Sequence, residues 1–140
     1  MAPIADINYL AVLGAAVASM ILGSIWYSPM LFGNLWMKLS KMNSKDKKKA
    51  QQKGMGKLYF TSFITVLITS FVLANFVDFL QAGTIVEGMQ VGFMVWFGFV
   101  ATMLLNNVIW GKESIKAYFL NAGFHLVSLV LMSSILTIWV

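Results

Sequence analysis

Four long apolar runs alternate with short polar stretches along the chain. The runs lie at about 8–27, 58–79, 85–110 and 115–140. Each has at least the ~20 residues that a helix needs to cross ~30 Å of hydrocarbon. Helices are required because lipid offers no partner to an unpaired backbone group. The pattern therefore predicts one all-α membrane domain over residues 1–140, a bundle of four transmembrane helices.

The positive charges predict how this bundle is oriented. All ten basic residues are lysines, eight of them between Lys38 and Lys57 and the other two at Lys112 and Lys116. Short loops rich in lysine stay in the cytoplasm. We therefore expect both lysine-rich loops inside, both termini outside (N-out/C-out), and a multi-pass protein of the plasma membrane. A net charge of +5 with only 11% charged residues fits a polybasic segment at anionic lipid headgroups, not a nucleic-acid surface.

The cytoplasmic loop 28–57 begins with a short stretch of helical character. Ser28 is a suitable N-cap, and Pro29 suits a first helical position because it has no N–H to satisfy. We expect a short helix from Pro29 to about Leu39, lying in the membrane interface. Its apolar residues Leu31, Phe32, Leu35 and Trp36 would face the acyl chains, and Trp26, Tyr27 and Trp36 would form an aromatic belt.

Three sequence motifs resemble those of a known family. The first is W-Y-S-P-x-L-F-G-x-x-W, with Trp26, Tyr27, Ser28, Pro29, Phe32, Gly33 and Trp36. The others are L-L-N-N-x-x-W at 104–110 and N-A-G-F-H at 121–125. Together they resemble the small bacterial integral membrane proteins called "domain of unknown function 1761". The resemblance implies a membrane protein of four helices with no assigned activity, substrate or cofactor.

Polar residues cluster at one depth of the predicted bundle. His125 lies nine residues beyond Lys116, which places it roughly 13 Å into the membrane at 1.5 Å per residue. The candidates for a polar layer at or near this depth are His125, Asn121, Asn106, Asn107, Thr65 and Ser19. We expect His125, Asn121 and Asn106 or Asn107 to point inward and to be hydrogen-bonded within one protomer. The layer is either the floor of a cytoplasm-facing cavity or a set of hydrogen bonds between helices.

Two further patterns each have two interpretations. Small residues recur four apart at Ala11, Ala15, Ser19 and Gly23, and again at Gly88 and Gly92, which suits either packing within one bundle or a dimer face. The carboxylates Asp78 and Glu87 fall at the outer ends of two spans. They either mark the outer membrane boundary or bind a cation or protons.

The chain carries no sequence signature of an enzyme. It has no Cys, a single His and five carboxylates, and it contains no H-E-x-x-H or Gly-rich phosphate loop. We expect no catalytic residue, no metal and no cofactor. The preferred interpretation is a non-enzymatic protein that acts by assembly, as a homo-oligomer or as an accessory subunit of a membrane complex. The alternative is a small-solute or ion transporter or channel with a polar cavity around His125.

Overall fold

The computed structural model describes residues 7–28, 30–39 and 55–139. Every regular element in these ranges is helical: α1 (Tyr9–Trp26), α2 (Gly33–Leu39), α4 (Met55–Phe79), α5 (Ile85–Val95), η1 (Trp96–Ala101), α6 (Thr102–Ile109) and α7 (Ile115–Ile138). Four of the helical stretches are long and apolar enough to cross a membrane, at Tyr9–Trp26, Gly56–Phe79, Ile85–Ile109 and Ile115–Ile138. The prediction of an all-helical chain with four such helices is confirmed.

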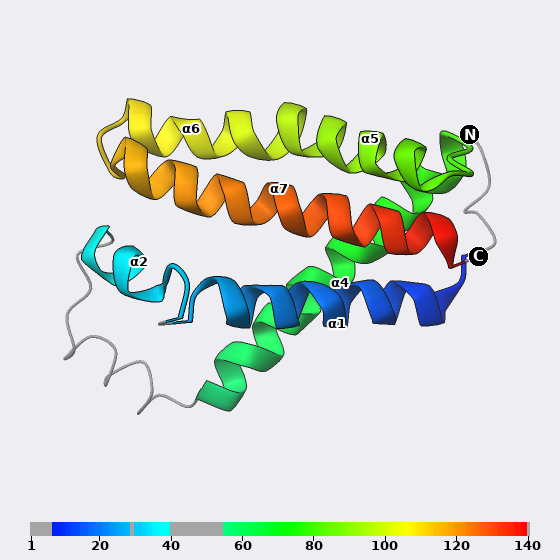
Figure 1. Cartoon of the computed structure of the whole chain (residues 1–140), viewed down its shortest axis with the longest axis horizontal. Helices are drawn as coiled ribbons and strands as arrows, with labels where there is room; N and C mark the ends of the chain where they lie inside the picture. Colours follow the sequence, from blue (N-terminus) through cyan, green and yellow to red (C-terminus); the bar gives the residue numbers. More distant parts are fainter. Residues whose placement is uncertain (1–6, 29, 40–54, 140) are drawn as a thin grey trace.

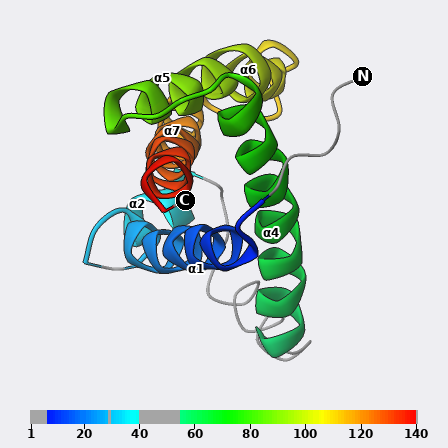
Figure 2. The same ribbon diagram turned by 90° about the vertical axis from the view of Figure 1, so that its right-hand side faces the viewer.

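The helix α7 lies at the centre of the bundle, with α1 on one side and α5, η1 and α6 on the other (Figure 1). The helix α4 crosses α1 and α7 obliquely (Figures 1 and 2). Asn8 Nδ2 donates to the carbonyl oxygen of Trp139 at 3.5 Å, so the two described ends of the chain lie together. We call this the terminal end of the bundle. The opposite end, which carries α2, the start of α4 and the α6–α7 turn, is called the lysine end because Lys38, Lys57 and Lys112 lie there.

Local sequence signals explain where the helices start. The side chains of Asn8, Thr84 and Ser114 cap α1, α5 and α7 by accepting hydrogen bonds from backbone N–H groups of the first turn. These are the residue types that satisfy the orphan donors of a helix. Each cap therefore determines the residue at which a spanning helix begins.

The main hydrophobic core lies in the half of the bundle nearest the terminal end. It consists of residues from the first half of α1, the last third of α4, the second half of α5 and the last half of α7: Ala11, Val12, Ala15, Leu73, Ala74, Val77, Val91, Leu129, Met132 and Leu136. In the same half, the buried Ser70 hydroxyl donates to the carbonyl oxygen of Val12 at 2.9 Å and joins α4 to α1. The helices α1 and α4 are therefore in direct contact in this half of the bundle.

Small residues bring the helices together within this one chain. Ala11, Ala15 and Ser19 are buried in the bundle. Gly88 and Gly92 pack α5 onto α7, where a Cβ at Gly92 would stand 2.7 Å from the carbonyl oxygen of Leu129. Such close approach is how membrane helices gain packing energy. These small-residue faces pack helices against one another within the protomer, in agreement with the interpretation of packing within one bundle.

The third spanning helix contains a π-helical segment that the sequence analysis did not predict. In η1, the i→i+5 pattern adds a residue to the turn and rotates everything that follows. Two hydrogen bonds connect this segment to α7. Trp96 Nε1 donates to the carbonyl oxygen of Ala122 at 2.8 Å, and the Tyr118 hydroxyl donates to the carbonyl oxygen of Ala101 at 2.9 Å.

The short helix after α1 begins later than predicted. It starts at Gly33, because Ser28 is used to end α1 instead of capping α2. The Ser28 hydroxyl donates to the carbonyl oxygen of Ile25 at 2.7 Å, and the Ser28 carbonyl oxygen accepts from the N–H of Gly33 at 2.8 Å. Pro29, predicted as the first helical residue, lies outside the described residues. Of the predicted lipid-facing residues, Leu31 and Leu35 are exposed.

Candidate functional site

A crevice opens at the lysine end of the bundle. It consists of two adjoining cavities of about 390 and 440 Å³ that share Ser19, Thr65, Val66 and Phe124. The deeper cavity is also lined by Thr69, Phe99, Val100, Met103, Leu104, His125, Ser128, Leu129 and Met132, and the shallower one by Met20, Gly23, Ser24, Tyr27, Tyr59 and Ser62. We call this space the lysine-end crevice. Its size falls in the range of small-molecule sites.

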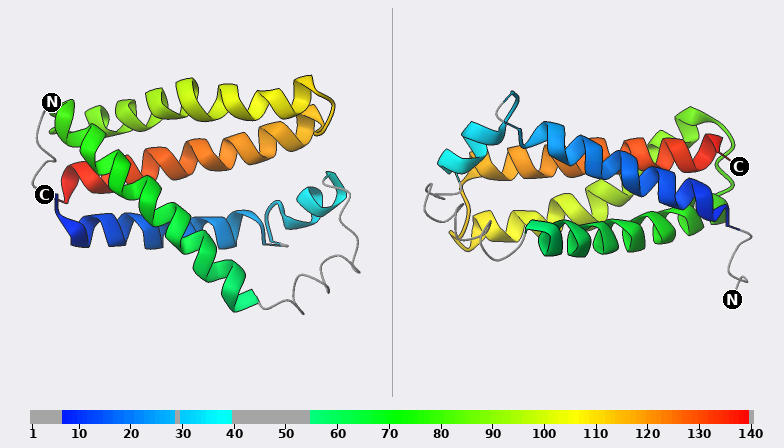
Figure 3. Two further views of the ribbon diagram at one scale, coloured as in Figure 1. Left: turned by 180° about the vertical axis from the view of Figure 1, so that it is seen from behind. Right: turned by 90° about the horizontal axis from the view of Figure 1, so that it is seen from below.

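The crevice exists because α4 diverges from the rest of the bundle. Near the terminal end, Leu73 and Val77 hold α4 in the core. Toward its start, the helix leans away from α6 and α7, as Figure 3 shows from behind. The side chains of Phe99 and Met103 on the facing wall remain 66% and 65% exposed. The crevice is therefore open along its side as well as at the lysine end.

His125 lies where the crevice meets the core. It is partly buried near the middle of α7 and lines the deeper cavity. Beside it, the buried hydroxyls of Ser19 and Ser128 share a hydrogen bond of 2.6 Å that joins α1 to α7. Within the described ranges, the His125 imidazole has no hydrogen-bond partner, unlike these two serines. The expectation that His125 is hydrogen-bonded within the protomer is therefore wrong for the described part of the chain.

The wall formed by α4 carries hydroxyl groups on one face. Ser62, Thr65 and Thr69 recur at helical spacing and all three are exposed to the crevice. The Thr65 hydroxyl donates to the carbonyl oxygen of Ser62 at 2.7 Å, and that of Thr69 to the carbonyl oxygen of Thr65 at 3.0 Å. Their donors are thus used within α4, while their oxygens still have lone pairs that can accept.

Asn121 belongs to a second polar group, near the mouth of the crevice. Its Oδ1 accepts from the Tyr27 hydroxyl at 2.8 Å, and its Nδ2 donates to Glu113 Oε1 at 2.8 Å. Burial, and secondarily the charge of Glu113, raise the pKa of Tyr27 to about 12. The sequence analysis missed Glu113, although it is the single acidic residue between Lys112 and Lys116.

Asn106 and Asn107 do not join either polar group. Both side chains are exposed, so the expectation that one of them points into the bundle is wrong. Their positions were inferred from depth alone. The π-helical turn Trp96–Ala101 adds a residue just before them and rotates α6 relative to a regular helix.

The residues of the first motif fold onto the third. Trp26 Nε1 donates to the carbonyl oxygen of Leu120 at 3.2 Å, and its ring contacts Phe32 and Phe124 with centroid distances of 4.8 and 6.2 Å. A Cβ at Gly33 would overlap the Tyr27 carbonyl oxygen, so only glycine fits there. Trp26 and Tyr27, which were predicted to form an aromatic belt, thus join the end of α1 to α7. Trp26 also contacts the turn before α2 through Phe32. The side chain of Trp36 lies outside the described part of the structure.

A sequence model of the family described as "Protein of unknown function (DUF1761)" matches residues 10–137. The match spans nearly the whole chain. The chain belongs to this family. No curated protein and no solved structure matches it.

Within this family member, the motifs that carried the resemblance are joined by direct contacts. Tyr27 of the first motif bonds Asn121 of the third, and the Tyr27 and Phe124 rings meet edge to face at 5.4 Å. Both Tyr27 and Phe124 line the lysine-end crevice. These motif residues therefore form one side of the crevice mouth.

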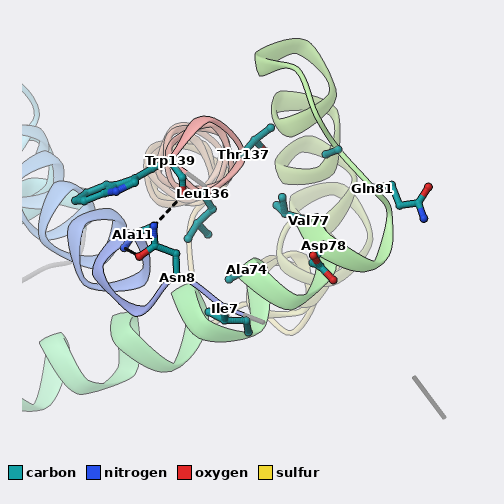
Figure 4. Close-up of a pocket in the computed structure, with 11 residues that line it drawn as sticks. Ile7, Asn8, Ala11, Ala74, Val77, Asp78, Gln81, Leu136, Thr137 and Trp139 are labelled. Atoms are coloured by element: carbon teal, nitrogen blue, oxygen red, sulfur yellow. Dashed lines mark hydrogen bonds between the residues drawn. The ribbon is translucent and has the colours of Figure 1, made fainter. Parts of the chain in front are cut away.

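The predicted outer carboxylates lie apart from this site. A cavity of about 290 Å³ at the terminal end is lined by Asn8, Asp78, Gln81 and Trp139 among others (Figure 4). Asp78 is exposed at its edge. Glu87 Oε1 accepts from the Thr84 hydroxyl at 3.1 Å, while the Thr84 oxygen accepts from the Glu87 N–H at 3.2 Å. The Thr84 oxygen thus caps α5, and Glu87 in the first turn accepts from the capping hydroxyl, which accounts for Glu87 as a helix-start residue.

The crevice presents both polar and apolar groups. Its described lining offers hydroxyls, one imidazole, aromatic rings and thioethers, and none of those residues is acidic. Among the residues that the structure describes, no three His, Asp or Glu side chains come together to hold a metal ion.

Proposed function

We propose that this protein is a small transporter of the bacterial inner membrane that takes up a solute in the lysine-end crevice, with His125 at its floor. In this proposal the lysine end faces the cytoplasm and both termini face outside. The lysines support this orientation, because positive residues near helix ends stay inside. The proposal contains no catalytic step.

One observation supports it most strongly. Core residues of α1, α4 and α7 separate the lysine-end crevice, which reaches His125 in the middle of α7, from the smaller cavity of about 290 Å³ at the terminal end. A site near the membrane midplane that opens to one side is what alternating access requires. Burying an ionisable side chain at that depth costs free energy, so such a residue is a candidate functional group. The position of His125 in the crevice lining suits contact with a bound solute.

The test uses the absence of cysteine from the chain. Single cysteines are introduced at Ser62, Thr65 and His125 and exposed to a membrane-impermeant, water-soluble methanethiosulfonate. We expect labelling at all three positions in inside-out vesicles and not in right-side-out vesicles. The matched control is Ile68→Cys on the same helix, whose side chain is 60% exposed and does not line the crevice.

Two results would contradict the proposal. If Thr65→Cys is as unreactive as Ile68→Cys from either side, the crevice is closed to water. If it reacts only in right-side-out vesicles, the orientation is reversed.

A second candidate function is assembly with another copy or with a different membrane protein. The observation that favours it is the open side of the crevice, where Phe99 and Met103 are largely exposed. A partner helix packed there would complete the bundle. Particle mass in mild detergent tests this candidate, and assembly predicts that Phe99→Ala lowers the mass to that of one chain.

A further inference from the structure

The lining of the lysine-end crevice narrows the class of molecule that fits it. Resting on the proposed function, we propose that the ligand is a single-chain anionic amphiphile, such as a fatty-acid anion. Its charged head lies at the lysine end, and its chain extends toward His125 and Met132.

The crevice is polar at its mouth and more apolar at depth. Ser24, Tyr27 and Ser62 line the shallow cavity, which lies toward the lysine end. The deeper cavity also has polar lining residues, but Val100, Leu104, Leu129 and Met132 make its lining the more apolar of the two. Such a gradient matches a molecule with one polar end and one apolar end, because each end then meets surface of its own kind.

The charges at the mouth favour an anion over a cation. Lys57 lies two residues before Tyr59 on the α4 wall, and Lys112 follows α6 on the other side. None of the described residues lining the crevice is acidic. Glu113 keeps its negative charge while it accepts a hydrogen bond from Asn121, but the described lysines at this end, Lys38, Lys57, Lys112 and Lys116, outnumber it. The net positive charge of the lysine end therefore attracts an anionic head and disfavours a cation.

The open side of the crevice favours a molecule that dissolves in the membrane. Thr65 on α4 and Phe99 on the opposite wall are both exposed along this opening. The hydroxyls of Thr65 and Thr69 donate to their own helix, so a strongly hydrophilic solute would find few donors there. An amphiphile can enter sideways from the bilayer while its head stays at the lysine surface.

The experiment measures protection of Thr65→Cys from the water-soluble reagent in bilayer nanodiscs. Three probes are compared at equal membrane content: laurate, its neutral methyl ester, and dodecylammonium. Asn34→Cys on α2, which is exposed, is the control for changes in surface potential. We expect laurate to slow labelling of Thr65→Cys relative to Asn34→Cys, with a much smaller effect of the other two probes.

The lysines are tested by charge removal and charge retention. Lys57→Gln and Lys112→Gln should each weaken protection by laurate by about fivefold, the effect expected for one lysine near a membrane surface. Lys57→Arg should keep the protection, and Lys38→Gln on α2 should leave it unchanged. The arginine variant separates loss of charge from loss of folding.

Each outcome has a distinct meaning. If Thr65→Cys reacts but laurate protects no better than its ester or dodecylammonium, the anionic class is wrong while the proposed function stands. If Lys38→Gln weakens protection as much as Lys57→Gln does, the lysines act through the general surface potential and not at the crevice. That result also overturns the inference. If Thr65→Cys does not react at all, the proposed function fails and the inference fails with it.

Discussion

Replacing Gly92 by alanine tests a close contact between α5 and α7. The added Cβ would stand 2.7 Å from the carbonyl oxygen of Leu129 and 2.8 Å from the Cα of Val130, and it would overlap the Ser133 hydroxyl. Two of these three neighbours are backbone atoms of α7, which cannot rotate away. The two helices must therefore separate to admit one methyl group.

The expected cost follows from two opposing terms. Overpacking a close-packed site costs about 1–3 kcal/mol, and rigid backbone neighbours place this site in the upper half of that range. Alanine in place of glycine within a helix recovers about 0.5–1 kcal/mol. The free energy of unfolding should therefore fall by about 1–2 kcal/mol. Gly98→Ala is the matched control, because no atom lies within 4 Å of its added Cβ.

The assay is reversible unfolding by sodium dodecyl sulfate in mixed micelles, followed by helical circular dichroism. We expect Gly92→Ala to unfold at less dodecyl sulfate than the unchanged protein, and Gly98→Ala at the same amount or more. Equal stability of the two variants would refute the close approach of α5 to α7 at Gly92.

Two further predictions concern the polar group at the crevice mouth. Asn121→Ala removes the acceptor of the Tyr27 hydroxyl and should destabilise the protein by about 1–3 kcal/mol in the same unfolding assay, while Asn106→Ala at an exposed position should stay within about 0.5 kcal/mol of the unchanged protein. Tyr27 has a pKa raised to about 12 in the folded state, so the unfolded chain loses this proton first as the pH rises above 10. Stability should therefore decline between pH 10 and 12, and this decline should shrink in Tyr27→Phe; an identical decline in that variant would contradict the raised pKa.

The sequence alone was sufficient to predict an all-helical chain with four helices that could span a membrane. Hydropathy over four runs of about twenty residues leaves no other structure that satisfies the backbone in lipid. The side chains of Asn8, Thr84 and Ser114 accept hydrogen bonds from N–H groups two or three residues ahead, so this capping depends only on the local sequence. Family membership could also be recognised from the sequence, because each motif is a contiguous stretch of the chain. The family model matches residues 10–137.

The site residues were only partly predictable. Depth, counted along a regular helix, grouped His125, Thr65 and Ser19, and all three line the crevice. The same count failed for Asn106 and Asn107, since one π-helical turn changes the direction of every side chain after it. A hydropathy pattern contains no signal for that turn.

Only the tertiary structure decided that a crevice opens between α4 and the rest of the bundle at the lysine end. The crevice depends on the angle at which α4 crosses α1 and α7, and that angle results from many small contacts at Ser70, Leu73 and Val77 acting together. Similarly, Glu113 becomes a partner of Asn121 only when the α6–α7 turn folds back against α7. Membrane insertion depends on properties of single segments, whereas the shape of a binding site depends on the relative positions of segments far apart in the chain.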